Sequence, residues 1–511
     1  MASSPAGTAV RSPTGFLALT VIGSLLAVFA LAQVTWALGL IGQPDEVMYH
    51  EAVVYDQAAR LVRGEPLYQS FDRPPYAVTA YTPVYYVLAG ALQAAVGPGF
   101  AAGRTLSFAA SLIATGLLAY LAARCAGDWR PGALAALLFL GLGIPGVFLV
   151  PWSGMYKEDL LGVALSVGAV AALAGGTSHR RIALAAALAA LAFLTKQTFV
   201  AAGLASFAWL WLIDRRRALL FGLLGCSIVF IAGALLEVTS GAFLRNAVFA
   251  NVNPFSVRAL TDNLAMLELF QGAALFLAGS YVLRRASDLW KHADTLVVLY
   301  WLASFLPLVG LAKIGSNRNY WIELAGATAV LAALSAWSWA TARLSTGYRW
   351  LTRGGLVLLA LELVLLLPLL GAAVALGLHP LSAPPTDRAA LDALIEEVRA
   401  TPGEVLADPL DVVVLAGRPI YFEPYIFSIL YGEGRWDVTP LVERICSGGV
   451  GLLVLGYPLD GKQPAYHGYP QWPAPAVAAL RETMVLQRQQ AGRWVYVPGV
   501  GDVSGACGSD R

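Results

Sequence analysis

The chain has 511 residues, of which 58% are hydrophobic and only 13% are charged, and its formal net charge is +2. With a mean hydropathy of +0.65, this composition lies outside the range of soluble globular proteins and predicts an integral membrane protein. It does not favour nucleic-acid binding, because the arginines gather at the ends of apolar runs. The sequence has no glycine-rich phosphate loop, so a nucleotide cofactor or nucleotide-sugar donor is not expected.

Apolar runs of about 20 residues recur along most of the chain, and each can cross a hydrocarbon core about 30 Å thick as a helix. A polytopic α-helical membrane protein is therefore expected, with about eleven spans. These lie at residues 15–41, 104–122, 132–150, 159–175, 181–195, 197–213, 218–237, 263–283, 293–312, 319–341 and 354–378.

The short basic loops set the predicted orientation, because cytoplasmic loops are enriched in Lys and Arg. When the spans alternate, these loops and Arg11 fall on one side, so the N-terminus is predicted to be cytoplasmic and everything after residue 378 outside. The excess of Arg over Lys and the many Ala, Leu and Gly residues are typical of a GC-rich bacterial genome, which predicts the bacterial plasma (inner) membrane. Residues 30–32 resemble a signal-peptide cleavage site, but the apolar run continues to Ile41, which favours a span.

The first outer loop, residues 42–104, has amphipathic helical periodicity and is expected to lie along the membrane surface. Its segment 83–96 is apolar but only about 14 residues long, which favours an interfacial or re-entrant helix over a span. Treating this segment as a span would invert every later loop and place the arginine clusters outside.

Charge density rises after residue 380, which predicts two domains: a membrane domain at 1–380 and a small extracytoplasmic α/β domain at 381–511. Helices are expected at 387–400 and 438–446, and strands at 405–407, 412–415 and 450–455. Strands at 484–489 and 494–497 should form a hairpin, and residues 382–385 are the expected linker. A disulfide between Cys446 and Cys507 is predicted in this outer domain, with two unpaired thiols as the alternative.

Charged residues gather on the predicted outer face at four places: Asp45 with Glu46, Glu158 with Asp159, Lys196, and the stretch 313–323. Each place also has an explanation without function. Asp45 and Glu46 could be interfacial acids at a span end, Glu158 and Asp159 could cap a helix, Lys196 could extend its ammonium to water, and residues 313–318 could form a solvated hairpin. Their joint presence on one face favours a site. Lysine and arginine bind a phosphate well, and a carboxylate can accept a proton from an attacking hydroxyl, so the set suits glycosyl transfer from a lipid-linked sugar.

Ordered motifs strengthen this interpretation. PDEVMY at 44–49, RGEPLY at 63–68 and YTPVYY at 81–86 resemble the first outer loop of the GT-C superfamily of polytopic glycosyltransferases. The pattern is most similar to bacterial members akin to protein O-mannosyltransferases and aminoarabinose transferases. GRTLS at 103–107, KEDLL at 157–161, LTKQ at 194–197 and NRNY at 317–320 continue the similarity through most of the membrane part.

The resemblance implies a polyprenyl-phosphate sugar as donor and an inverting single displacement on the outer face, onto a lipid, glycan or protein acceptor. It maps the essential first-loop acid onto Asp45, with Glu46 beside it. The second-loop acid maps onto Asp159, or else Glu158, as a helper or metal ligand. The residues that would bind the donor phosphate are Lys196, Lys313, Arg318 and Arg104.

A divalent cation, Mg²⁺ or Mn²⁺, is expected only in part of the superfamily. The candidate ligands are Glu46, His50, Glu158 and Asp159, although a lone interfacial histidine is more often structural. This chain also has Thr82 where the relatives carry His or Lys, so a phosphate or metal contact there is in doubt.

Two further alternatives concern the acceptor and the class of protein. Aromatic residues of the outer domain can stack on sugar rings or simply fill its core; these are Tyr421, Tyr425, Tyr431 and Trp436. A transporter or flippase of lipid-linked sugars would share the polytopic form and use intramembrane acids such as Glu268 and Glu362, but the internal repeats typical of transporters are not evident.

Overall fold

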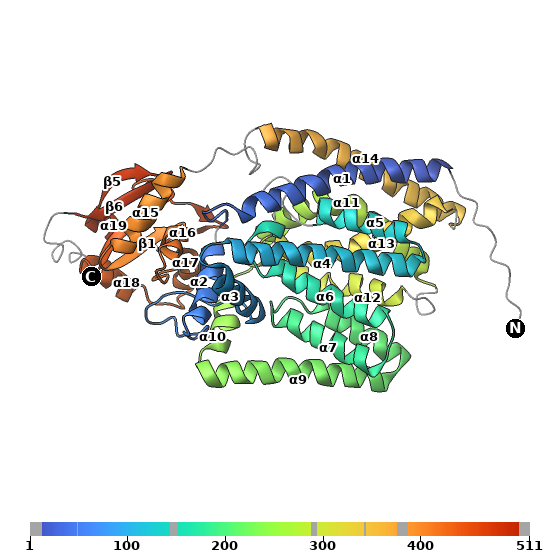
Figure 1. Ribbon diagram of the computed structural model, residues 1–511, viewed down its shortest axis with the longest axis horizontal. Helices are drawn as coiled ribbons and strands as arrows, with labels where there is room; N and C mark the ends of the chain where they lie inside the picture. Colours follow the sequence, from blue (N-terminus) through green and yellow to red (C-terminus); the bar gives the residue numbers. More distant parts are fainter. Residues whose placement is uncertain are drawn as a thin grey trace, which may run out of the picture.

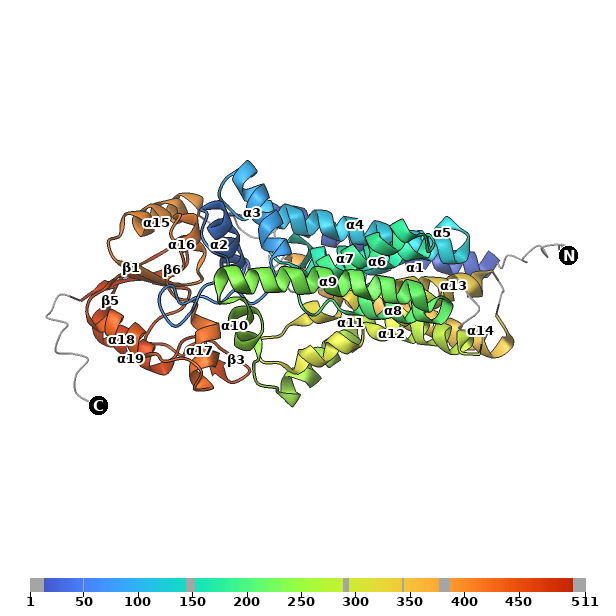
Figure 2. The same cartoon turned by 90° about the horizontal axis from the view of Figure 1, so that it is seen from below.

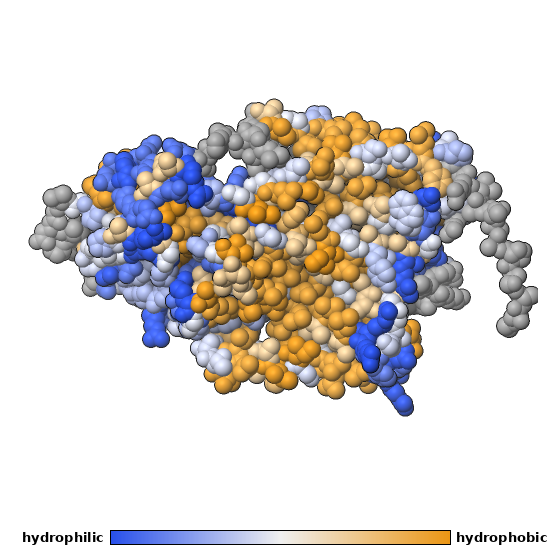
Figure 3. Space-filling view, viewed as in Figure 1, coloured by the Kyte–Doolittle hydropathy of each residue, from blue (hydrophilic) through white to orange (hydrophobic). Residues whose placement is uncertain are grey.

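The computed structural model describes residues 13–48, 50–143, 152–287, 294–341, 344–375 and 387–499. The molecule is elongated, with a bundle of long helices at one end and a mixed α/β region at the other (Figures 1 and 2). A hydrophobic surface covers the bundle, whereas hydrophilic residues cover the α/β region and the opposite end (Figure 3). This distribution is that of a polytopic membrane protein with a polar domain outside the bilayer.

Seven helical segments within the described residues are long and apolar enough to cross a membrane. They are α1 (Pro13–Ile41), α4 (Ala101–Ala126), α9 (Arg215–Ser240), α11 (Val257–Arg285), α12 (Thr295–Ala303) with η5 (Leu306–Ala312), η6 (Arg318–Trp321) with α13 (Ile322–Ala340), and α14 (Thr346–Ala375).

Shorter helices stand at the other four predicted spans: α5 (Trp129–Leu138) continuing into η1 (Phe139–Gly143), α6 (Asp159–Ala174), α7 (His179–Phe193) and α8 (Ala201–Ile213). Every predicted span therefore corresponds to a helical segment. The central helix is α13, which is buried along almost its whole length and packs against α4, α5 and α11.

The first outer loop contains α2 (Glu51–Val62) and α3 (Val84–Val96), which pack against each other. The predicted helix at 83–96 is confirmed, and its interfacial position stays a prediction. The α9–α11 connection contains two short helices, α10 (Phe243–Ala247) and η3 (Phe249–Asn251). A further short helix, η2 (Trp152–Gly154), precedes α6.

The C-terminal region has a four-stranded sheet of order β1-β2-β6-β5, in which only the β1–β2 pair is parallel. The strands are β1 (Glu404–Asp408), β2 (Val450–Leu455), β5 (Met484–Gln490) and β6 (Arg493–Pro498); β3 (Ala465–Tyr466) and β4 (Tyr469–Pro470) form a separate small hairpin. The helices are α15 (Arg388–Ala400), α16 (Asp411–Leu415), α17 (Pro424–Gly432), α18 (Thr439–Cys446) and α19 (Ala474–Thr483).

Most of the predicted outer-domain elements are confirmed, and one is wrong. Residues 412–415 form the short helix α16 and not a strand. A buried apolar run of four residues has no periodicity that separates the two structures, and here α16 packs its valines against α2 and α15. Cys446 is disulfide-bonded, while Cys125 and Cys226 are free. The predicted partner Cys507 and the predicted linker lie outside the described residues.

The first outer loop is joined to the C-terminal region. The backbone N–H of Tyr76 donates to the carbonyl of Tyr421 at 2.7 Å, and Glu423 N–H donates to the Tyr76 carbonyl at 2.8 Å. The rings of Tyr76 and Trp436 pack edge to face at 5.4 Å within one hydrophobic cluster. The predicted domain boundary at residue 380 stays a prediction, but the two parts share a core.

Candidate active site

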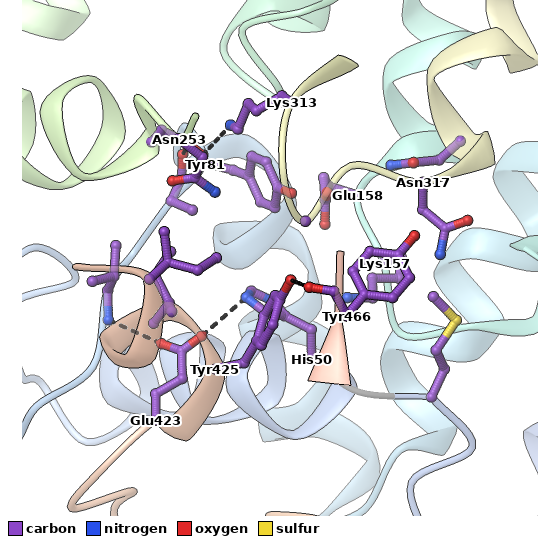
Figure 4. Close-up of a pocket in the computed structure, with 18 of the residues that line it drawn as sticks. His50, Tyr81, Lys157, Glu158, Asn253, Lys313, Asn317, Glu423, Tyr425 and Tyr466 are labelled. Carbon is purple, nitrogen blue, oxygen red and sulfur yellow. Dashed lines mark hydrogen bonds and ion pairs between the residues drawn. The ribbon is translucent and has the colours of Figure 1, made fainter. Parts of the chain in front are cut away.

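A cavity of about 350 Å³ lies where the loops at one end of the bundle meet the C-terminal region. Its lining comes from five parts of the chain (Figure 4). These are the first outer loop (Met48, His50, Val78, Ala80, Tyr81), the segment before α6 (Trp152, Lys157, Glu158, Asp159), the α9–α11 connection (Asn251, Asn253), the turn before α13 (Lys313, Gly315, Asn317, Asn319, Tyr320), and the C-terminal region (Glu423, Tyr425, Ile426, Ile429, Tyr466, Gln471).

Two adjacent carboxylates in the cavity wall share one lysine. The Nζ of Lys196 lies 2.9 Å from Glu158 Oε1 and 2.7 Å from Asp159 Oδ1. All three side chains are buried. Burial alone would lower the pKa of Lys196, but Asp159 and Glu158 outweigh it and hold this pKa well above its usual range. The predicted Lys196 thus meets the second-loop acids and does not itself line the cavity.

Several polar and aromatic groups fix this acid–lysine triad, which consists of Glu158, Asp159 and Lys196. Trp152 Nε1 donates to Asp159 Oδ2 at 2.8 Å, and Asn319 Nδ2 donates to Oδ1 at 2.9 Å. The Lys196 ammonium also lies 4.4 Å from the ring centroid of Tyr81 and 5.5 Å from that of Tyr320. Both rings line the cavity together with Glu158 and Asp159, so the triad lies against two aromatic residues of the cavity wall.

The ring of Tyr320 packs directly against the backbone of Gly310, which has no side chain to block it. A Cβ added to Gly310 would lie 2.4 Å from the ring of Tyr320. Any larger residue at this position would displace the ring and the cavity wall that it forms.

The cavity also contains two lysines with no acidic partner. Among the described residues, no carboxylate lies within ion-pair distance of the Nζ of Lys157 or of Lys313. Lys313 Nζ donates to Asn251 Oδ1 at 2.8 Å. Burial lowers the pKa of Lys313 to about 8, with a further contribution from the nearby charge of Lys196, and burial also lowers the pKa of Lys157. Lys157 is buried and Lys313 is partly buried, and neither ammonium is in ion-pair contact with a carboxylate, so both are available to bind an anion in the cavity.

The C-terminal region contributes a buried acid to the opposite wall. Glu423 Oε1 lies 3.1 Å from His50 Nε2, and Glu423 Oε2 accepts from the N–H of Val78 at 3.1 Å. Figure 4 shows this pair on a different side of the cavity from Lys313. Tyr425, one of the predicted sugar-stacking residues, donates from its hydroxyl to the carbonyl of Tyr466 at 3.2 Å.

The other three predicted stacking residues do not line the cavity. Tyr421 and Trp436 are buried in the cluster that contains Tyr76, and Tyr431 is exposed. Tyr421 and Trp436 therefore fill the core of the C-terminal region, which was the alternative to sugar stacking.

The predicted catalytic pair lies beside the cavity rather than in its lining. The backbone N–H of Glu46 donates to Asp411 Oδ2 at 3.1 Å, and this carboxylate also pairs with Arg493. Glu46 Oε1 accepts from Ala52 N–H at 3.2 Å, while Oε2 is enclosed and has no partner. Burial, followed by the charges of Asp411 and Glu51, raises the pKa of Glu46 to about 8. Asp45 is half-buried in the same segment, three and five residues before Met48 and His50, which do line the cavity.

Arg104 has a different position from the one predicted. All five N–H donors of its buried guanidinium are used: by both oxygens of Glu51, at 3.0 and 2.8 Å, and by the carbonyls of Leu40, Gln43 and Asp45, at 2.8 Å each. No donor is left for a phosphate, and Arg104 does not line the cavity. The guanidinium instead fixes the chain that carries Asp45 to the N-terminal end of α4. Arg318 is half-buried and does not line the cavity, although its neighbours Asn317 and Asn319 do.

The four candidate metal ligands do not fit a metal site. The described residues contain no group of three or more His, Cys, Asp and Glu side chains placed to hold an ion. Glu158 and Asp159 already share the Lys196 ammonium, His50 pairs with Glu423, and Glu46 lies outside the cavity lining. The lysine supplies the positive charge that a metal would bring to these acids.

Some cavity residues escaped the sequence analysis. Lys157 stands in the KEDLL motif directly before the two acids. Its position in the sequence could have indicated that it belongs to the same site. Glu423 carries no signal, because it belongs to another region and reaches the cavity only through the pairing of Tyr76. Asn251 and Asn253 stand in a loop without periodicity.

No protein-family model and no curated protein matches this sequence. Solved structures do match the fold. ArnT from Cupriavidus metallidurans bound to undecaprenyl phosphate superposes with a TM-score of 0.58 at 15% identity, covering 97% of this chain and 100% of that one. The protein therefore has the fold of ArnT. This chain also matches the Archaeoglobus fulgidus oligosaccharyltransferase in complex with Zn and sulfate, with a TM-score of 0.54 at 15% identity, over 93% of this chain and 73% of that one.

Proposed function

We propose that this GT-C protein transfers a sugar from a polyprenyl-phosphate donor to an acceptor hydroxyl at the outer face of the membrane. The observation that carries the proposal is a pair of lysines, the buried Lys157 and the partly buried Lys313, which line one cavity without a carboxylate in ion-pair contact. The ArnT structure with undecaprenyl phosphate supports this choice of donor, because that protein has the same fold. The acceptor is a lipid, glycan or protein hydroxyl.

The charge of the two lysines suits the leaving group better than the donor. A polyprenyl-phosphate sugar is a phosphodiester with one negative charge, whereas the departing polyprenyl phosphate carries up to two. Two cations without counter-ions therefore interact more strongly as the glycosidic bond breaks, which lowers the barrier and not only the binding free energy. Asn251 holds the Lys313 ammonium in place for this role.

Transfer would proceed by single displacement with inversion. The acceptor oxygen bonds to the anomeric carbon, the bond from that carbon to the phosphate oxygen breaks, and the hydroxyl proton passes to a carboxylate. Asp45 is our proposed base. Glu46 is less suitable because its raised pKa keeps it protonated at neutral pH. The triad of Glu158, Asp159 and Lys196 would hold the side chains of the cavity wall in position beside the reacting atoms.

The proposed topology has eleven spans, a cytoplasmic N-terminus and an extracytoplasmic C-terminal domain in a bacterial plasma membrane. In this arrangement the arginine-rich loops lie at the cytoplasmic end, opposite the C-terminal region, which agrees with the charge rule for short loops. The cavity then opens at the level of the outer leaflet, where a lipid-linked sugar is accessible.

The test is a transfer assay in proteoliposomes with a panel of polyprenyl-phosphate sugars and the anomeric configuration of the product as readout. Asp45→Asn should lower the rate by about 10²–10⁴-fold, the usual contribution of a general base. The matched control is Asp72→Asn, an exposed acid of the same loop that pairs with Arg245, so it reports what the loss of a charge in this loop does away from the cavity. Undiminished transfer by correctly folded Asp45→Asn excludes it as base. Translocation of the lipid-linked sugar with no transfer from any donor favours the transporter alternative.

A further inference from the structure

Three oxygen atoms of the cavity residues can accept a hydrogen bond but receive none. They are Oδ1 of Asn253, Oδ1 of Asn319 and Oε2 of Glu158, which are enclosed and have no donor within the part of the chain that the structure describes. All three residues line the cavity, where Figure 4 shows Asn253 and Glu158. A buried oxygen without a donor costs stability and is rare unless a bound molecule supplies the donor. Three of them around one cavity therefore indicate a ligand that carries several hydrogen-bond donors.

The partners of the two amides fix which of their atoms is the free one. Asn253 Nδ2 donates to the Ile314 carbonyl at 2.9 Å, and Asn319 Nδ2 donates to Asp159 Oδ1 at 2.9 Å. A carbonyl and an ionised carboxylate only accept, so the atom facing each of them must be the amide nitrogen. The remaining atom of each amide is an oxygen, and its ligand must donate. Hydroxyl groups of a sugar are donors of this kind.

Asn253 stands beside the lysine proposed to bind the donor phosphate. Its amide nitrogen bonds to Ile314, which directly follows Lys313, and the Lys313 ammonium bonds to Asn251, two residues before Asn253. In a lipid-linked sugar the phosphate is attached to the anomeric carbon. The hydroxyl nearest to the phosphate is therefore the one on the neighbouring ring carbon, the 2-hydroxyl.

The other two free acceptors stand together at the acid–lysine triad. Asn319 Nδ2 and Lys196 Nζ both contact Asp159 Oδ1, at 2.9 and 2.7 Å. Lys196 Nζ also lies 2.9 Å from Glu158 Oε1. The triad is near Lys313, because the charge of Lys196 contributes to the lowered pKa of Lys313. A sugar whose phosphate lies at Lys313 can therefore extend toward this second pair of acceptors.

We propose that Asn253 binds the 2-hydroxyl of the donor sugar and that Asn319 and Glu158 bind hydroxyls farther from the phosphate. This inference rests on the proposed function, since it takes the same donor. It adds a requirement that the two lysines do not impose: the sugar carries a free hydroxyl next to its anomeric carbon. A hydrogen bond to this hydroxyl strengthens as positive charge develops on the sugar ring, so Asn253 acts on the transition state as well as on binding.

The test compares kcat/KM for a polyprenyl-phosphate sugar and for its 2-deoxy analogue. Asn253→Leu should lower kcat/KM for the parent donor by about tenfold, the effect of losing one hydrogen bond in a buried site, and change kcat/KM for the 2-deoxy donor much less. Each donor is compared with itself across the two proteins, so the intrinsic reactivity of the donors cancels. Equal losses for both donors would overturn the assignment of Asn253.

Asn263→Leu is the matched control. Asn263 is also buried, and its amide donates to the Leu311 carbonyl at 3.3 Å, just before Lys313, but it does not line the cavity. This variant loses an amide contact to the same part of the chain without losing an acceptor of the cavity. Its effect on the two donors should therefore be equal. A loss confined to the parent donor in this control would also overturn the assignment.

A second measurement needs no turnover. Wild type should bind the parent polyprenyl-phosphate sugar about tenfold more tightly than the 2-deoxy analogue, and Asn253→Leu should remove most of this difference. Equal affinity of wild type for the two compounds overturns the proposal even if the variant does not fold. If no donor supports transfer but the affinity difference is present and depends on Asn253, the proposed function fails and the sugar site stands.

Discussion

Replacing Lys196 with methionine should separate the structural role of this lysine from the phosphate-binding role of Lys157 and Lys313. In the native protein Lys196 is 1% exposed and contacts Glu158 at 2.9 Å and Asp159 at 2.7 Å. The variant leaves two adjacent buried carboxylates without a cation. Breaking a buried ion pair in this way costs about 3–5 kcal/mol, so we expect a loss of stability of this order at pH 8.

The loss should depend on pH in a defined direction. Without the lysine, one of the two acids in the folded variant takes up a proton more readily than in the unfolded chain, so its folded pKa is raised. The unfolded chain then holds fewer protons between the two pKa values, and the stability of the variant falls as pH rises from about 5 to 8. Adding Glu158→Gln to Lys196→Met removes one of the two carboxylates and should restore part of the stability.

The assay is reversible denaturation in detergent at pH 5 and pH 8 for wild type, Lys196→Met and the double variant with Glu158→Gln. Lys462→Met, which changes an exposed lysine of the C-terminal region, is the control for loss of a positive charge. A Lys196→Met protein as stable as wild type at both pH values, or a double variant less stable than the single one at pH 8, would refute the account of the triad.

Three further expectations concern titration and metal dependence. Because the pKa of Lys313 is lowered to about 8, KM for the donor should rise as pH increases through 8 to 9, and Lys313→Arg should abolish this rise, since arginine stays charged; an unchanged profile in the arginine variant contradicts it. Because burial raises the pKa of Glu46 from 4.5 to about 8, the folded protein loses stability as pH rises between these two values, so Glu46→Gln should increase the melting temperature at pH 9 much more than at pH 5; an equal gain at both would point to another cause. Transfer should persist after chelation with EDTA, because Glu158 and Asp159 are already neutralised in part by Lys196; activity that is lost and then restored by Mg²⁺ or Mn²⁺ would restore the metal hypothesis.

The sequence predicts the helices well because each apolar run is long enough to fix its own structure. It also predicts that Glu158, Asp159 and Lys196 share one face, since all three stand at span ends on the same predicted side. The short apolar run at 412–415 has no such internal signal, and packing against neighbouring helices decided its helical structure.

Other parts of the site depend on contacts between distant segments. Glu46 meets Asp411 across 365 residues of chain, and His50 meets Glu423 only because the first loop pairs with the C-terminal region. The family resemblance assigned Arg104 to the phosphate, but Glu51 and three backbone carbonyls take all its donors. Periodicity describes one element at a time, so it cannot place these partners.

The most direct test of the central claim is the affinity of the purified protein for polyprenyl phosphate without turnover, measured by native mass spectrometry or calorimetry at pH 7. The double variant Lys157→Met/Lys313→Met should bind at least tenfold more weakly than wild type, because each charge-assisted hydrogen bond contributes about 1.5–3 kcal/mol. Lys462→Met should bind like wild type. Equal affinity of the double variant and wild type would contradict the assignment of this cavity as a lipid-phosphate site.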